Sequence, residues 1–413
     1  MASWSGSYPF PRIEPSPLLY EPPRSPAQAR EMTMTQRPYL LLASLLLGLV
    51  PGACSSPAPA GSQAAALGDE PFGPMRPADR LIEKHEVHFK HLWQVTHGGQ
   101  NTRPRWSPNG EQITYQFSNL ATGVECDHVR VQDLQTGRVR AVSDGRGVNS
   151  VGGFLPDGQQ LVFASTRAAQ TDCPSPPDRW LGYVWPVDPA YDLHLADLSS
   201  GAIRTLVDDP GYDGHANVSN AGDAILFCSR RSGDLELWRC DREGGDLRRL
   251  TDRQGYEAGA SWSPDDTEIV FAATVFDPEN VETQRKRYEA QLEHWATEPG
   301  SMKIEAMAAD GSGRRTVTSP GGANWDPCFT PDGSQILFAS NHHGAVPDPR
   351  SFDLFLVNLD GSGLERVTYF DHSVGRQYDG FPNFSRNGRF LAFSSNRGTG
   401  EIGETNVFVA EWQ

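Results

Sequence analysis

At the start of four segments that are expected to be equivalent strands of a repeat, an aromatic residue directly precedes a carboxylate. If the fold brings these pairs together, their carboxylates form a ring that attracts a cation such as Ca²⁺, or a basic side chain of a partner. The alternative is structural, with each acid bonded to the backbone of a neighbouring segment. His215 follows the first pair closely. The ligand-binding candidates are Asp213, His215, Tyr256, Glu257, Trp325, Asp326, Tyr378 and Asp379.

The elements that must position these residues form an internal repeat, which appears six times. In each repeat a turn rich in Pro, Asp, Asn and Gly precedes an apolar triplet, and such turns predict β-hairpins. Third and fourth strand patterns follow the triplet, so the repeat predicts a four-stranded blade. The triplets begin at Ile113, Leu161, Ile225, Ile269, Ile336 and Leu391.

The two ends of the repeat region complement each other. The sixth repeat stops after its third strand, Val407–Val409, while Leu92–Thr96 has the pattern of a fourth strand and precedes the first repeat. Pairing of these segments removes two open sheet edges. The sequence therefore predicts an all-β, six-bladed β-propeller with four-stranded blades, closed by an N-terminal strand in the last blade.

These repeats resemble the TolB-like propeller family over residues 90–413. The resemblance depends most on Trp262-Ser263-Pro264-Asp265, on Phe329-Thr330-Pro331-Asp332-Gly333, and on the later Asp-Gly-Ser-Gly turns at 310 and 360. It implies the fold and says little about function. TolB carries a further α/β domain before its propeller. We expect that domain to be lacking here, so a role in the Tol-Pal system does not carry over.

Strand direction assigns the loops to two faces. The fourth-to-first and second-to-third connections share one face, and the Pro-Asp-Gly and Asp-Gly-Ser-Gly turns lie on the other. The long insertions all fall on the first face, which we call the loop-rich face, at 168–190, 277–300, 342–351 and 397–405. Because long loops more often carry function, we expect recognition there.

Catalytic motifs are lacking. The sequence has no Gly-x-Ser-x-Gly elbow and no His-Glu-x-x-His. His215, His342 and His343 are candidate metal ligands, although His342 and His343 also suit a solvated loop. We expect a binding protein rather than an enzyme. The alternative is a metal-dependent propeller enzyme, similar to an oligogalacturonate lyase.

Five cysteines follow Cys54. Cys126 and Cys173 lie in corresponding loops of adjacent repeats, and we expect a disulfide between them in an oxidising compartment. Cys228 and Cys240 flank one hairpin, so a second pairing stays open. Cys328 is expected to be a small core residue.

The N-terminal 84 residues predict targeting rather than a folded domain. Residues 1–31 read as an untranslated or disordered extension, 32–53 as a signal peptide, and 54–84 as a flexible tether ahead of the propeller at 85–413. The segment before Cys54 resembles a lipobox, with Pro51 where that motif has Leu. The resemblance implies lipidation of Cys54, and the alternative is simple cleavage nearby.

Charge narrows the class of partner. The net charge of −16 makes nucleic acid a poor partner, because binding to phosphates needs clustered Lys and Arg. We expect an exported, monomeric lipoprotein of the periplasm or outer membrane, attached to the membrane by its lipid alone. Its expected partner is an envelope protein or glycan. No cofactor is certain, and Ca²⁺ is the candidate.

Overall fold

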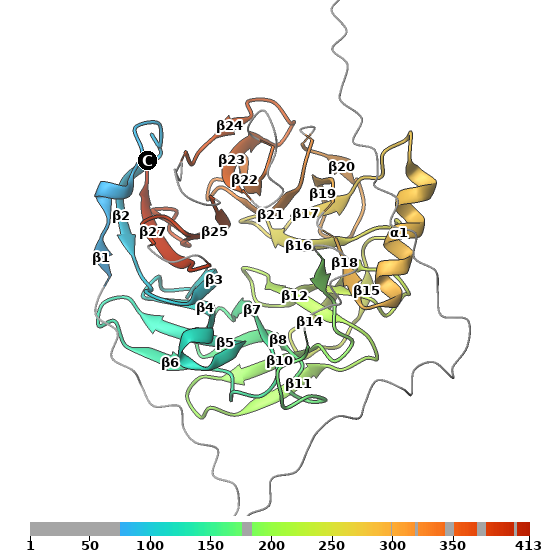
Figure 1. Cartoon of the computed structure of the whole chain (residues 1–413), viewed down its shortest axis with the longest axis horizontal. Coiled ribbons are helices and arrows are strands. Elements are labelled where there is room, and N and C mark those ends of the chain that lie inside the picture. The colour runs from blue at the N-terminus through green and yellow to red at the C-terminus, as the bar shows by residue number, and fades with distance from the viewer. Residues whose placement is uncertain are drawn as a thin grey trace, which may run out of the picture. The chain divides into compact units, whose positions relative to one another are not determined.

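The computed structural model describes residues 75–175, 184–298, 300–318, 321–342, 351–369, 377–399 and 403–413. Six antiparallel sheets surround a central axis in this part of the chain, and each contributes a four-stranded blade (Figure 1). The predicted all-β, six-bladed propeller is therefore confirmed. Cys54 and the segment before it lie outside the described residues.

Each blade runs outward from an innermost strand at the axis. Blade 1 contains β3 (Gln100–Trp106), β4 (Gln112–Asn119), β5 (Val124–Asp133) and β6 (Val139–Ala141), and blade 2 contains β7 (Asn149–Phe154), β8 (Gln160–Ser165), β10 (Asp192–Asp197) and β11 (Ile203–Val207). Blade 3 contains β12 (Asp213–Val218), β13 (Ala224–Ser229), β14 (Glu236–Asp241) and β15 (Arg248–Arg249).

The remaining three blades repeat this pattern. Blade 4 contains β16 (Glu257–Trp262), β17 (Glu268–Thr274), β19 (Met302–Ala308) and β20 (Arg315–Thr316). Blade 5 contains β21 (Asn324–Phe329), β22 (Gln335–Ser340), β23 (Asp353–Asn358) and β24 (Glu365–Arg366), and blade 6 contains β25 (Asp379–Phe384), β26 (Phe390–Ser395), β27 (Asn406–Trp412) and β2 (Phe89–Gln94).

The first-to-second turns show how short polar residues set the hairpins. In blade 1 the Ser107 hydroxyl donates to Asn109 Oδ1, which also accepts from the backbone N–H of Glu111. Gly110 has φ +73°, a conformation that suits a residue without a Cβ. The apolar triplets that follow these turns are buried between the blades and form the core.

The N-terminal strand closes the ring. β2 pairs antiparallel with β27, with Leu92 opposite Ala410 and Trp93 opposite Val409. A short outer strand, β1 (Arg76–Pro77), pairs with β2, and the Asp79 carboxylate accepts from the Leu92 N–H at 2.8 Å. The structured region thus already includes residues 76–81, which the sequence placed in the tether.

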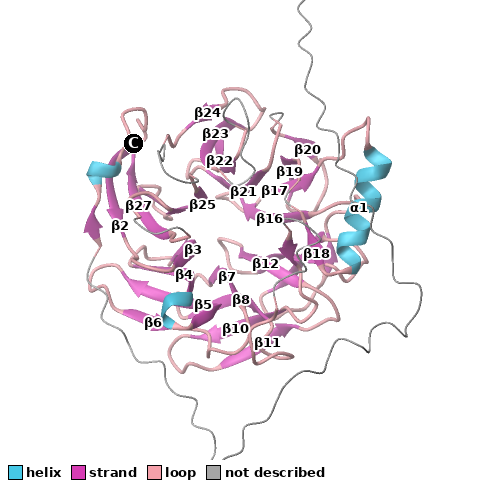
Figure 2. Cartoon of the chain, in the orientation of Figure 1, coloured by secondary structure: helices cyan, strands magenta, loops and turns pink. Residues whose placement is uncertain are grey.

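Two insertions build extra structure on the loop-rich face. Strand β9 (Trp185–Pro186) from blade 2 pairs with β18 (Ala296–Thr297) from blade 4. Helix α1 (Val281–Glu293) precedes β18 and lies at the rim of the disc (Figure 2). Two 3₁₀ turns, η2 (Asp79–Leu81) and η3 (Leu120–Thr122), complete the helical content of the described residues. No helix among them is long and apolar enough to cross a membrane.

Candidate functional site

A β-bulge at the same position of each innermost strand lines the centre of the propeller. The bulge interrupts the pairing of all six innermost strands with their neighbours. It leaves two residues outside the ladder in five blades, and Gly152 alone in blade 2, where Val151 stays paired with Phe163. We call the six residues that lie two positions before the pairing resumes the first channel ring. Its members are Arg103, Val151, His215, Gly259, Asp326 and Phe381.

Four members of the first channel ring adopt a backbone conformation that side chains disfavour. Arg103, His215 and Phe381 have φ +54°, and Asp326 has φ +47°. Glycine occupies this position in blade 4, where Gly259 has φ +65°. Left-handed backbone at residues with a Cβ costs free energy and concentrates at functional sites. Its repetition around one axis marks the channel as the candidate site.

The side chains of the first channel ring contact one another across the axis. Arg103 Nη1 donates to His215 Nδ1 at 3.2 Å and lies 3.9 Å from Asp326 Oδ1. The Arg103 guanidinium also stacks 4.4 Å from the centre of the Phe381 ring. Tyr256 extends the cluster, with its hydroxyl 3.0 Å from His215 Nε2. Polar groups of blades 1, 3, 4 and 5 and the Phe381 ring of blade 6 therefore meet in one cluster.

Burial determines the charge of this cluster. Burial lowers the pKa of His215 well below its usual value, and the positive charges of Arg103 and Arg105 lower it further, so the imidazole is neutral. A neutral ring that accepts at Nδ1 carries its proton on Nε2, which can donate to Tyr256. Burial also raises the pKa of Asp326, against the opposing effect of Arg103 and Arg105. Asp326 Oδ2 is buried without a hydrogen-bond partner in the described part of the chain.

An aromatic cover lies over this cluster on the loop-rich face. Trp185 of β9 stacks on Trp325 with ring centres 5.0 Å apart, and its ring centre lies 6.0 Å from that of Tyr256. Trp325 also packs edge-on against Phe381 at 5.1 Å. Trp185 and Trp325 are partly exposed. The insertion of blade 2 thus supplies a ring that no innermost strand provides.

Three of the predicted acids are buried in ion pairs. Both oxygens of Asp213 accept from Arg231 Nη2 at 2.9–3.0 Å, and Asp379 Oδ2 accepts from Arg397 Nη2 at 3.0 Å. Glu257 pairs with Arg314. Burial raises the pKa of Asp213 to about 6, and Ser229 and Arg231 partly offset that effect.

A sequence signal accompanies two of these pairs. Arg231 and Arg397 each stand two residues after the serine that ends a second strand, Ser229 or Ser395. Asn149 occupies the Asp213 position in blade 2, where Arg167 binds Asp144 instead. The Ser-x-Arg spacing therefore indicates an arginine that pairs with the buried acid of its own blade and does not bind a ligand.

Asp326 does not correspond to the other three acids. Trp325 pairs with Ala339 and therefore matches Gly214, which pairs with Cys228. Asn324 is thus the counterpart of Asp213, and Asp326 is the counterpart of His215. The expected equivalence of the four aromatic and acidic pairs is wrong by two residues in blade 5, because a bulge separates the two positions.

The sequence patterns did not identify Arg103, Arg105 or Trp185. A local signal could have identified Arg103, because Arg103, Asp326 and Phe381 each precede a proline, namely Pro104, Pro327 and Pro382. Proline has no N–H to donate to the ladder, so it suits a bulge. Trp185 has no such signal, since its position depends on the pairing of two insertions.

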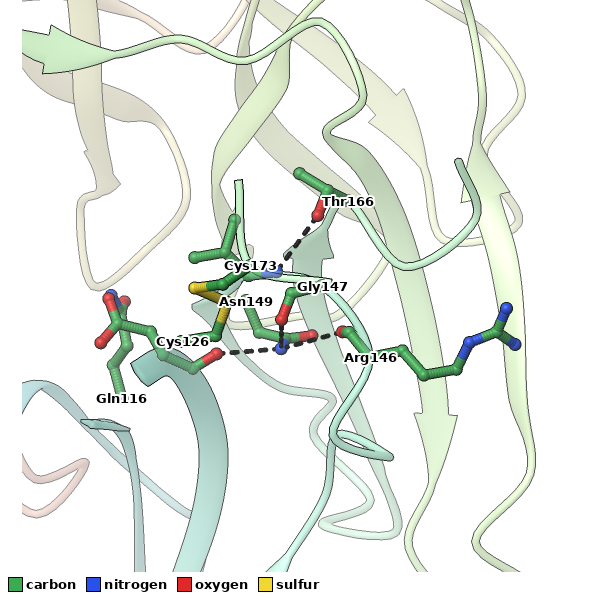
Figure 3. Close-up of a disulfide and its surroundings, with 9 residues drawn as sticks. Gln116, Cys126, Arg146, Gly147, Asn149, Thr166 and Cys173 are labelled. Carbon is green, nitrogen blue, oxygen red and sulfur yellow. Dashed lines mark hydrogen bonds between the residues drawn. A yellow bond between two sulfur atoms is a disulfide. The ribbon is translucent and has the colours of Figure 1, made fainter. Parts of the chain in front are cut away.

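One pair of cysteines forms a disulfide, and the other three described cysteines are free. A disulfide joins Cys126 to Cys173, with Cα atoms 5.4 Å apart, and so links strand β5 of blade 1 to the loop after β8 of blade 2 (Figure 3). Beside it, Asn149 Nδ2 donates to the backbone oxygen of Asp127 at 2.9 Å. The alternative pairing of Cys228 with Cys240 is not formed, because both thiols are free and buried, as is Cys328.

The histidine candidates do not gather into a metal site. His342 packs against Phe355, and His343 lies outside the described residues. Among the described residues, no three side chains of the His, Cys, Asp or Glu type converge.

The chain is similar to several known proteins at low sequence identity. No family model matches the chain. An uncharacterised protein of Agrobacterium fabrum, Atu1656, is 20% identical over 79% of this chain and 94% of its own length. A TolB homolog of Chlorobium luteolum is 26% identical over 164 residues, which cover 35% of this chain and 36% of that protein.

The chain is a six-bladed β-propeller that is similar in sequence, over about a third of its length, to a TolB homolog. Solved structures with a similar arrangement include TolB of Acinetobacter baumannii, with 17% identity, a TM-score of 0.48 and coverage of 74% of this chain and 65% of that one. An oligogalacturonate lyase in complex with manganese has 14% identity, a TM-score of 0.46 and coverage of 82% and 97%. The matched segment spans about a third of the length of the Chlorobium TolB homolog.

Proposed function

We propose that this propeller belongs to an exported binding protein of the cell envelope. A lipid at Cys54 tethers the protein to the membrane, and the loop-rich face of the propeller binds an envelope protein. Export is supported by the disulfide between Cys126 and Cys173, because structural disulfides persist in oxidising compartments. The signal-peptide pattern of residues 32–53 supports the same location.

The aromatic cover carries the proposal. Trp185 and Trp325 present stacked, partly exposed rings above a cluster that contains Arg103 and Tyr256. Trp, Tyr and Arg are the residues that most often dominate binding energy at protein interfaces. A protein partner can place an apolar side chain against these rings, while its polar groups meet the rim of the loop-rich face. A glycan is the second candidate, because the same rings can stack on a sugar.

Matched variants on opposite faces test this proposal. The face opposite the loop-rich face carries the Pro-Asp-Gly and Asp-Gly-Ser-Gly turns, and we call it the tight-turn face. Leu364 lies in the β23–β24 turn on this face and is 41% exposed, so Leu364→Ala controls for the loss of an exposed apolar group. Partners retained from an envelope extract are identified with immobilised wild-type protein, and their affinities are then measured for each variant. Trp185→Ala should weaken a specific partner at least about tenfold, the usual effect of removing a central aromatic contact.

The outcomes separate the candidates. A partner that is lost by Trp185→Ala and kept by Leu364→Ala, with both variants folded by thermal melting, supports the loop-rich face. If no protein partner is retained and the protein binds a glycan array in a way that depends on Trp185, the partner of the loop-rich face is a glycan. Equal retention by wild type and Trp185→Ala contradicts the proposal.

A further inference from the structure

A cavity of about 350 Å³ lies at the other end of the channel, where the first-to-second turns converge. Its inner wall comes from a second channel ring, placed two residues beyond the first along each innermost strand. This ring points to the tight-turn face, away from the aromatic cover. Its members are Arg105, Gly153, Asn217, Ser261, Cys328 and Asn383.

The charge of the cavity is opposite to that of the whole chain. The chain has 52 acidic and 36 basic residues, with a net charge of −16. Two arginines, Arg105 and Arg386, line the cavity, and no carboxylate lines it. Acids of the nearby turns accept from backbone N–H groups. Asp157 accepts from the Gln159 N–H at 2.8 Å, and Asp266 accepts from the Asn220 N–H of the adjacent blade at 2.8 Å. A positively lined cavity in an acidic protein favours an anion.

Arg105 is only partly satisfied by the protein. Its Nη1 donates to the Pro104 carbonyl oxygen at 3.0 Å, while Nε is buried without a hydrogen-bond partner in the described residues. No carboxylate in this part of the chain lies within ion-pair distance of Arg105. Burial lowers the pKa of Arg105, and the more distant Asp326 offsets only part of this effect. A partly buried guanidinium without an ion-pair partner loses part of its hydration, and a bound anion offsets that cost.

We propose that this cavity binds a carboxylate-bearing ligand, whose carboxylate accepts hydrogen bonds from Arg105 while the exposed Arg386 supplies a second positive charge at the turn. The other members of the second ring suit this role, because Asn217, Ser261 and Asn383 are uncharged and can donate hydrogen bonds. A dicarboxylate such as succinate carries two negative charges at neutral pH, which match the charges of the two arginines, Arg105 and Arg386. This site lies on the face opposite the aromatic cover and does not depend on the proposed function.

Titration of the full chain with succinate tests the proposal, with its uncharged analogue succinamide as the ligand control. Binding is followed by calorimetry and by thermal melting at constant ionic strength. Succinate should bind and raise the melting temperature with concentration, whereas succinamide should not. Arg105→Gln should weaken succinate at least about tenfold, as expected for loss of a charged hydrogen bond.

The neighbouring turn offers a matched pair of exposed arginines. Arg386 lines the cavity, while Arg389 is bonded to Glu411 outside it. Arg386→Gln should weaken succinate severalfold, and Arg389→Gln should leave it unchanged. Because Arg386 is exposed, its variant tests the site even if Arg105→Gln fails to fold. Inorganic phosphate that binds where succinate does not would overturn the carboxylate assignment. Equal succinate affinity in wild type and Arg386→Gln would overturn the site.

Discussion

At the scale of single residues, the first channel ring combines a strained backbone with side-chain contacts at the propeller axis, and these contacts offset the free-energy cost of the strain. A left-handed backbone at a residue with a Cβ costs on the order of 1 kcal/mol, and Arg103, His215, Asp326 and Phe381 all adopt it. The contacts among Arg103, His215 and Phe381 offset this cost because they converge from three blades. Strain of this kind is retained where the surrounding structure holds the side chains in a required arrangement.

His194 gives a prediction for acid stability. It is fully buried in β10 beside Phe163, and burial lowers its pKa to about 4. An unfolded histidine has a pKa of about 6.5, so folding favours the neutral ring. Its contribution is therefore complete above pH 6.5 and is lost as the pH falls from 6.5 to 4, by on the order of 2 kcal/mol.

Replacing His194 should remove that part of the acid sensitivity. In urea unfolding measured between pH 7.5 and 4.5, His194→Leu should lose less stability than wild type, by on the order of 2 kcal/mol. His194→Asn, which also cannot titrate, controls for the apolar gain and should show the same reduced slope. An unchanged slope in both variants would show that His194 does not titrate in this range.

At the scale of elements, the insertions of different blades support one another. Trp185 of β9 is held opposite Thr297 of β18, and the Val187 N–H donates to the Trp295 carbonyl oxygen at 2.8 Å. Helix α1 packs through buried Tyr288 and Leu292, and the Tyr288 hydroxyl donates to Asp234 at 2.5 Å. The aromatic cover therefore depends on two insertions that are far apart in the sequence.

The disulfide between Cys126 and Cys173 should stabilise the loop-rich face. It closes a loop with a sequence separation of 47 residues. The chain-entropy model gives about 4 kcal/mol for such a loop, and measured values are often lower. The double variant Cys126→Ser, Cys173→Ser should lose about 2 to 4 kcal/mol of unfolding free energy.

Reducing agent provides the matched control. Wild type should fall to the stability of the double variant when reductant is added, while the double variant should not change. The remaining cysteines, Cys228, Cys240 and Cys328, are free and leave this comparison unaffected. Identical unfolding of oxidised wild type and the double variant would contradict a stabilising role.

The sequence predicted the types of the elements better than it predicted where they begin and which distant segments they contact. Asp277 and Pro278 form a local pattern typical of a helix start, yet helix α1 begins at Val281, because the Asp277 carboxylate accepts from the Glu279 N–H in a turn ahead of the helix. Local patterns give strand and turn types. They do not show that Trp185 reaches Trp325 or that Glu257 pairs with Arg314, since those contacts join distant segments.

At the scale of the whole molecule, the repeat allowed the six blades and their order to be predicted. Counting apolar triplets was sufficient, because each blade repeats the same turn and strand pattern. The channel was harder to predict, since a bulge shifts the inward-facing register by one residue and separates Asp326 from Asp213. The direction of each face and the identity of both channel rings depend on ring closure by β2.

Hydrogen exchange at β2 tests that closure most directly. In the ladder between these strands, Leu92 of β2 pairs with Ala410 of β27, and Gln94 pairs with Phe408. Amides of β2 that bond to β27 should exchange slowly and open together with those of β27, as one cooperative unit. Protection of β27 with exchange of β2 within seconds would contradict the closed ring, and with it the placement of both ends of the channel.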